Sequence, residues 1–196
     1  MQENEFSPED SLQLIQSMID KTKNSVADNS FYFLLWGWLV LAACIIQFVL
    51  KVIVQSPWHP LAWTLMIVGI IASALHGMNE NKSRKVKTYI GELLDYLWLS
   101  IFLSFLLLGF IFARLGWQNC YSFYMVMYAI GSFVTGRALK FSPLVWGAIG
   151  SWFLAIVSTF TSYDINILLS GLAIILSYII PGYLLKMKYR QMQVHV

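Results

Sequence analysis

Six apolar runs, separated by short polar stretches, divide the chain between residues 31 and 185. They cover 31–54, 61–78, 96–113, 120–139, 144–161 and 165–185. A helix rises about 1.5 Å per residue, so runs of roughly 18–24 residues reach about 27–36 Å, the hydrocarbon thickness of a bilayer. The pattern therefore predicts an all-α fold, an integral membrane bundle of six transmembrane helices.

Ahead of the first run the pattern turns amphipathic. Ser7-Pro8-Glu9-Asp10 has the residues of a helix start, and Leu12, Ile15 and Ile19 then recur at helical spacing against polar neighbours. We expect an N-terminal amphipathic helix over 8–27 on the cytoplasmic side. The expected domains are this segment (1–29), the six-span domain (30–186) and a cytoplasmic tail (187–196).

A second amphipathic stretch lies between the second and third runs. The basic hinge, residues 81–87, holds four cations, and the apolar positions after it continue into the third run. This spacing predicts one helix over 82–113. We expect Arg84, Lys85 and Lys87 to meet the N-terminal helix, forming a candidate partner surface whose full set is Leu12, Ile15, Ile19, Arg84, Lys85 and Lys87.

Charge predicts the orientation. Of the 13 Lys and Arg residues, all except Lys51 and Arg114 fall on one side of the predicted membrane, and such an excess is typical of the cytoplasmic side. The acidic first 28 residues lack the apolar core of a signal peptide, so the first span is expected to be an uncleaved anchor. Both termini are then cytoplasmic in an inner membrane. The composition, 58% hydrophobic and 12% charged, agrees with a membrane protein.

Two spans carry small residues at four-residue spacing, which allows another helix to approach closely. The seam residues are Gly69, Ser73 and Gly77 in the second span and Gly147, Ser151 and Ala155 in the fifth. We expect these two seams to meet. Pro181-Gly182 predicts a kink in the last span.

Candidate chemistry is sparse. His76, about one turn from the cytoplasmic end of its span, is a candidate titratable intramembrane residue, although a hydrogen-bonded structural histidine is the alternative. His59 is expected to face solvent, Lys51 to reach the membrane interface, and Cys120 to be more accessible than Cys44. We expect no catalytic residue, cofactor or metal site, because no convergent set of His, Cys, Asp or Glu is evident.

Three stretches carry a resemblance. They are residues 31–38 (FYFLLWGW), residues 85–90 with 96–98 (KVKTYI, YLW), and residues 139–144 with 177–183 (LKFSPL, SYIIPGY). Together they resemble a family of small multi-span membrane proteins of Bacteroidota that has no assigned activity. The resemblance implies the fold and a bacterial inner membrane.

Two functions follow from these patterns. The first is a non-enzymatic scaffold or regulatory partner acting through its cytoplasmic amphipathic surface. The alternative is a small permease or channel for a neutral solute, built from a 3+3 inverted repeat; Pro60-Leu61-Ala62-Trp63 against Pro143-Leu144-Val145-Trp146 is one short match, of a kind that chance also produces. The expected partners are the lipid bilayer, another membrane or cytoplasmic protein, and a second copy of the chain, with no nucleic acid.

Overall fold

The computed structural model describes residues 30–83 and 89–194, and within these ranges it contains helices and no strand. The first helix covers Ser30–Ile53 and ends in a π-helical turn, η1 (Val49–Ile53). The elements that follow are η2 (His59–Thr64, a 3-10 helix), α2 (Leu65–Ser83), α3 (Tyr89–Leu115), α4 (Cys120–Ala138), α5 (Ser142–Ser158), α6 (Tyr163–Ile174), η3 (Ile175–Ile179, π-helical) and α7 (Ile180–Val194). The last three run on without a break as one long rod.

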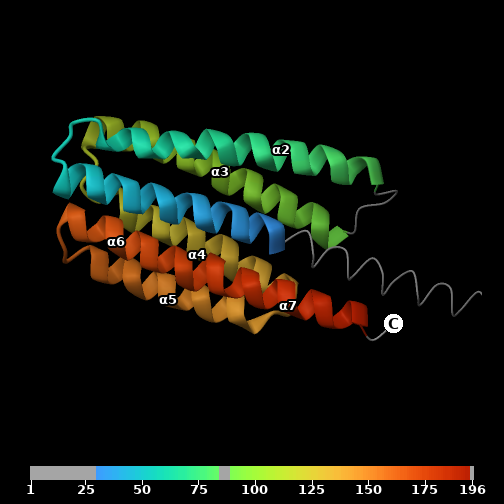
Figure 1. The fold of residues 1–196 in the computed structure, drawn as a ribbon. Helices are drawn as coiled ribbons and strands as arrows, with labels where there is room; N and C mark the ends of the chain where they lie inside the picture. The colour runs from blue at the N-terminus through green and yellow to red at the C-terminus, as the bar shows by residue number, and fades with distance from the viewer. Residues whose placement is uncertain (1–29, 84–88, 195–196) are drawn as a thin grey trace, which may run out of the picture.

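The rods lie side by side and alternate in direction (Figure 1). The connections 54–58, 116–119 and 159–162 share one end of the bundle, which we call the loop end. The turn from α4 to α5 and the end of α7 lie at the opposite end (Figure 1). This alternation puts polar groups near the ends of different helices within reach of one another.

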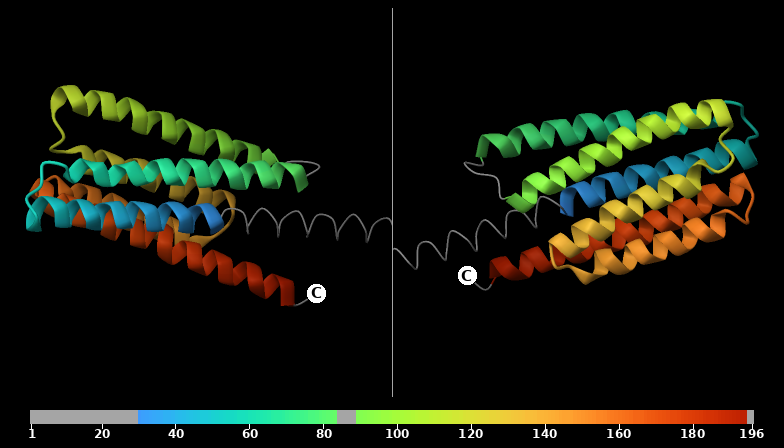
Figure 2. Two further views of the ribbon diagram at one scale, coloured as in Figure 1. Left: turned by 45° about the horizontal axis from the view of Figure 1, so that its top comes forward. Right: turned by 180° about the vertical axis from the view of Figure 1, so that it is seen from behind.

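Four helices in the described residues are long and apolar enough to cross a membrane: Ser30–Ile53, His59–Asn79, Tyr89–Leu115 and Tyr163–Lys188. α5 is apolar but shorter, with 17 residues. α4 carries three tyrosines and several hydroxyl side chains, and it lies inside the bundle between α3, α5 and α6 (Figure 2). A helix sheltered by protein does not need the apolar exterior that lipid demands.

The core is centred on α4. One face of this helix is buried along its whole length, from Cys120 to Gly136. It packs with the first helix, α5 and the α6 rod, and tight aromatic contacts join Phe33, Trp98, Tyr128 and Tyr178 from four different elements. The ring centroids of Phe33 and Tyr178 lie 5.1 Å apart in a T-shaped arrangement, a geometry that aromatic quadrupoles favour.

α2 and α3 lie at the edge of the bundle. Only 11% of the residues in the most apolar window of each is buried, against 56% in Tyr163–Lys188. The exposed side chains are large and apolar, for example Ile71 and Leu75 on α2 and Leu107 and Phe110 on α3. Contiguous apolar surface of this extent is unfavourable in water, so the structure describes a membrane-embedded protein.

The connection between α4 and α5 has only three residues, 139–141, and makes the two helices antiparallel neighbours. Lys140 adopts a positive φ of 50°, and the backbone N–H groups of Leu139 and Phe141 donate to Thr135 and Gly136 at 2.9 and 2.8 Å. These bonds satisfy carbonyls that the end of α4 leaves free. Pro143 at the start of α5 needs no helical partner for its nitrogen.

A kink is expected at Pro181, and the structure has a π-helical turn, η3, just before this residue. In η3 the N–H of Ile180 donates to the carbonyl of Ile175, five residues back. Pro181 has no N–H, so the next donor in this register is missing, and a local change of helix type is the usual accommodation. Gly147 of α5 lies against the backbone of this turn, at Leu176 and Ser177.

The expected meeting of the two seams is wrong. Gly69 and Ser73 of α2 face the first helix: a Cβ on Gly69 would lie 3.1 Å from the Trp36 ring, and Trp36 Nε1 donates to Ser73 Oγ at 3.1 Å. Gly147 and Ser151 of α5 face the α6 rod, where Ser151 Oγ donates to the carbonyl of Ala173 at 3.1 Å. Each seam admits a close neighbour, but a different one.

The single helix expected over 82–113 is also wrong at its start. Ser83 still belongs to α2, and α3 is described from Tyr89. The expected N-terminal helix over 8–27 lies outside the described residues.

Candidate functional site

A buried amide at the loop end gathers polar groups from three other elements. Gln47 sits in the first helix, 1% exposed, two turns before the helix ends. Its Oε1 accepts hydrogen bonds from Trp63 Nε1 and from the Tyr121 hydroxyl, each at 2.5 Å. Its Nε2 donates to the Tyr163 hydroxyl at 3.2 Å and lies 3.4 Å from His59 Nδ1.

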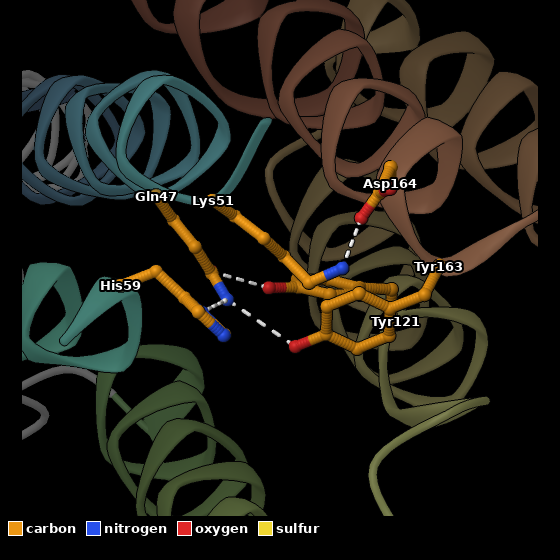
Figure 3. Close-up of polar contacts among 6 residues, drawn as sticks. All are labelled: Gln47, Lys51, His59, Tyr121, Tyr163 and Asp164. Atoms are coloured by element: carbon orange, nitrogen blue, oxygen red, sulfur yellow. Dashed lines mark hydrogen bonds and ion pairs between the residues drawn. The ribbon is translucent and has the colours of Figure 1, made fainter. Parts of the chain in front are cut away.

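These five residues form what we call the Gln47 network (Figure 3, which draws all but Trp63). His59 and Trp63 come from η2, Tyr121 from the first turn of α4 and Tyr163 from the start of α6. Both acceptor positions and both donor positions of the amide are therefore occupied. A buried amide that is fully satisfied avoids the cost of an orphaned polar group and links the helices that supply its partners.

An ion pair lies beside the network. Lys51, one turn after Gln47, contacts Asp164 in the first turn of α6, and its ammonium lies 4.7 Å from the centroid of the Tyr163 ring (Figure 3). The two side chains remain 30% and 44% exposed, so the pair contributes about 0–1 kcal/mol. An acid at a helix N-terminus is also favoured by the helix dipole.

Aromatic rings complete the site. Tyr121 packs edge-on against Tyr163 at 5.4 Å between centroids and tilted against Trp63 at 6.2 Å. Nearby, buried hydroxyls join the same helix ends: Ser122 and Ser158 lie 2.6 Å apart, and Thr161 donates to Asn166 at 2.5 Å. The chemistry is that of neutral hydrogen bonds plus one ion pair, suited to holding four helix ends together.

The other candidate residues are placed as follows. His76 stacks on Phe31 of the first helix at 3.9 Å between ring centroids, near the opposite end from the network. The seam residues Gly77 and Ala155 take ordinary packing positions: a Cβ on Gly77 would be 3.5 Å from the Tyr32 hydroxyl, and Ala155 is buried. The candidate partner surface, Leu12, Ile15, Ile19, Arg84, Lys85 and Lys87, lies outside the described residues.

Three expectations for single residues need correction. Cys120 is not the accessible thiol, since it and Cys44 are both buried, 3% and 1% exposed, and unpaired. Lys51 does not simply extend to the interface, because Asp164 pairs with it. His59 is only partly exposed, and its Nδ1 faces Gln47.

One residue in the sequence could have indicated the network, although the prediction from hydrophobic runs did not use it. Gln47 is the one amide side chain within the apolar stretch over residues 31–50. A lone amide at membrane depth needs partners. Trp63, Tyr121 and Tyr163 stand within a few residues of the loop-end connections, and the alternation of the helices brings them to the same level as Gln47.

Within residues 30–83 and 89–194, no three or more His, Cys, Asp or Glu side chains group closely enough to hold a metal ion. Comparison of the chain with protein-family models, with curated proteins and with solved structures finds no match. The function therefore has to be argued from the geometry.

Proposed function

We propose that the protein is a six-span integral protein of a bacterial inner membrane that acts, without enzymatic activity, as a scaffold or regulatory partner through its cytoplasmic surface. Four apolar helices support the membrane placement. α4 and α5 lie between or beside them in the same bundle (Figure 2). All six rods then cross together, and the lipid bilayer covers α2 and α3.

The distribution of charge supports an orientation with the loop end outside. The described charges at the loop end are Lys51, Arg114 and Asp164, of which two neutralise each other. Exposed cations gather at the opposite end: Arg137, Lys140, Lys186, Lys188 and Arg190. Excess Lys and Arg is typical of the cytoplasmic side, which supports a cytoplasmic location for both chain ends. The assignment to a bacterial inner membrane rests on the resemblance noted in the sequence.

One observation carries the non-enzymatic, scaffolding role. The Gln47 network uses every hydrogen-bonding position of its central amide on the protein's own side chains. The network therefore joins helices of the bundle, and the Gln47 amide has no hydrogen-bonding position left for a substrate. Binding is then expected at the cytoplasmic surface, where the amphipathic pattern over 8–27 and the basic hinge lie.

A second candidate function is a small permease or channel for a neutral solute. It is favoured by the position of the Gln47 network between the first three helices and the last three, where carriers with inverted repeats place their substrate. Two observations oppose it. The network lies near the helix ends instead of mid-helix, and α4, α5 and the α6 rod pack closely together, whereas α2 and α3 have no comparable contact with each other in the described residues.

The test is co-purification of the full chain from native membranes, read by mass spectrometry. Leu12, Ile15 and Ile19 are changed together to Gln, which keeps a helix-forming side chain but removes the apolar stripe. Gln13 and Gln16 changed to Ala, on the polar face, are the matched control. We expect a stoichiometric partner with the wild type and the control and its loss with the triple variant.

If neither the wild type nor the variants co-purify with a partner, and proteoliposomes of the purified protein transport neutral solutes, the permease becomes the better-supported function. Retention of the same partner by the triple variant would contradict the proposed surface.

A further inference from the structure

The tautomer of His59 follows from the donors around Gln47. An indole N–H can only donate, so the Trp63 contact at 2.5 Å fixes the carbonyl oxygen of the Gln47 amide on the Trp63 side. The Tyr121 hydroxyl donates to the same oxygen. The amide cannot turn over without placing its NH₂ group against the indole N–H.

With the oxygen fixed, the amide nitrogen faces His59. Gln47 Nε2 lies 3.4 Å from His59 Nδ1 (Figure 3), and an amide NH₂ has only hydrogens to offer. His59 Nδ1 must therefore accept, which requires a neutral ring with its proton on Nε2.

Protonation removes this contact. A proton on Nδ1 turns the acceptor into a donor, and two N–H groups then face each other. The titratable and charged groups around the ring are Lys51 from the first helix, Tyr121 from α4, and Tyr163 and Asp164 from α6. Lys51 repels an imidazolium, and Asp164, which would attract it, is already engaged by Lys51. His59 is partly exposed, so water is the accessible alternative for the charged ring.

We propose that the Gln47–His59 contact is a proton-operated latch: neutral His59 holds the start of η2 on the first helix, and protonated His59 releases it. Trp63 keeps its own bond to Gln47, and the backbone N–H of Ser56 keeps its bond to the carbonyl of Leu50. The released segment is therefore residues 57–61. If the proposed orientation holds, the latch responds to the pH outside the cell, but its operation does not depend on that orientation.

The first test reads the tautomer in the wild-type protein. The full chain, with ¹⁵N-labelled histidine, is studied by NMR in detergent, and the His59 signals are identified by their loss in His59→Gln. At about pH 8, where histidine is neutral, we expect the Nδ1 of His59 to show the shift of an unprotonated acceptor nitrogen and Nε2 that of an N–H. An Nδ1–H tautomer would overturn the proposal.

The second test reads the release. A nitroxide label is attached to a cysteine introduced at Leu61, which is 54% exposed; the native thiols are buried and do not compete. Between about pH 8 and pH 5, across the range in which histidine changes its charge, we expect the label's mobility to rise severalfold in the wild-type background. His59→Gln keeps an acceptor that cannot be protonated in this range, and it should abolish the change.

Two controls separate the latch from general acid loosening. The pH response should survive in His76→Gln, the other histidine among the described residues. A label at Phe160, in another loop-end connection, should show no change. A rise that persists in His59→Gln, or that occurs equally at Phe160, would refute the latch; neither outcome bears on the co-purification test, which concerns the opposite face.

Discussion

At the scale of single residues, Gln47 shows how one polar side chain organises several apolar helices. The energy of each interhelical hydrogen bond is modest, because helices apart in lipid also find partners for their polar groups. The loss of the acceptor is different, since the Trp63 and Tyr121 donors then lose the oxygen that they share. The network therefore acts mainly by selecting which helix ends pack together, and the total stabilisation from its hydrogen bonds is less important.

Gln47→Leu is expected to destabilise the protein by about 1–3 kcal/mol, because it removes the oxygen that accepts from both Trp63 Nε1 and the Tyr121 hydroxyl. Thermal unfolding in detergent measures the effect as a lower Tm. Gln118→Leu, the same substitution at an exposed loop-end position, should leave the Tm nearly unchanged. Equal effects at the two sites would show that the network contributes nothing specific.

Gly147→Ala tests a position where a backbone, not a side chain, fills the space. An added Cβ overlaps the carbonyl oxygen of Leu176 and comes within 2.9 Å of Ser177 Cα, and neither can rotate away. We expect a loss of about 1–3 kcal/mol from overpacking, read as a lower Tm. Gly150→Ala, where the Cβ meets only Leu176 Cδ1 at 3.5 Å, is the matched control and should be neutral or stabilising.

At the scale of elements, the small-residue seams show what a pattern predicts and what it omits. Close approach depends on the absence of a side chain at the position itself, and neighbouring atoms lie close to both Gly69 and Gly147. The identity of the neighbour depends on the shape of the other helix. Trp36 and Leu39 of the first helix pack against the α2 seam, and the π-helical turn η3 packs against the α5 seam. The spacing of the small residues does not show which helix packs against each seam.

Gly69→Leu should therefore weaken the contact of α2 with the first helix and leave α5 unaffected. The Cβ of the new side chain would already lie 2.9 Å from Leu39 Cδ1, and the rest of the leucine adds to this overlap. We expect the free energy of unfolding to fall by about 1–3 kcal/mol. Ala74→Leu, on an exposed face of α2, is the control and should have little effect on the Tm. A cross-link between cysteines at Leu39 and Gly69, formed in the otherwise wild-type protein, reports the contact directly; its absence would contradict the arrangement.

At the scale of the whole molecule, the loop end and the opposite end differ in charge, and the proposed orientation is open to labelling. Because Cys44 and Cys120 are buried, cysteines have to be introduced at exposed positions, Gln118 at the loop end and Gln191 near the end of α7. A membrane-impermeant maleimide added to intact cells should label Gln118→Cys, and Gln191→Cys only after permeabilisation. The reverse pattern would invert the topology.

The sequence by itself determined where the helices lie and that they are embedded in a membrane. A helix satisfies its backbone hydrogen bonds within one segment, and a run of about 20 apolar residues is needed to cross a bilayer; both requirements are local and can be read along the chain. The four residues between the fourth and fifth apolar runs, 140–143, likewise leave room only for antiparallel neighbours. The extension of α2 to Ser83 was missed because the residues after Met78 are polar and fall outside the apolar run.

Only the tertiary structure decided which helices touch and where the polar groups meet. Gln47 finds partners 12, 16, 74 and 116 residues away, and helices with similar apolar exteriors do not encode such choices in their hydrophobic pattern. Partner choice rests on side-chain shape and on the few polar groups that must be satisfied away from water. These are properties of pairs of surfaces, so the Gln47 network, the latch at His59 and the neighbours of both seams became visible only when the helices were placed together.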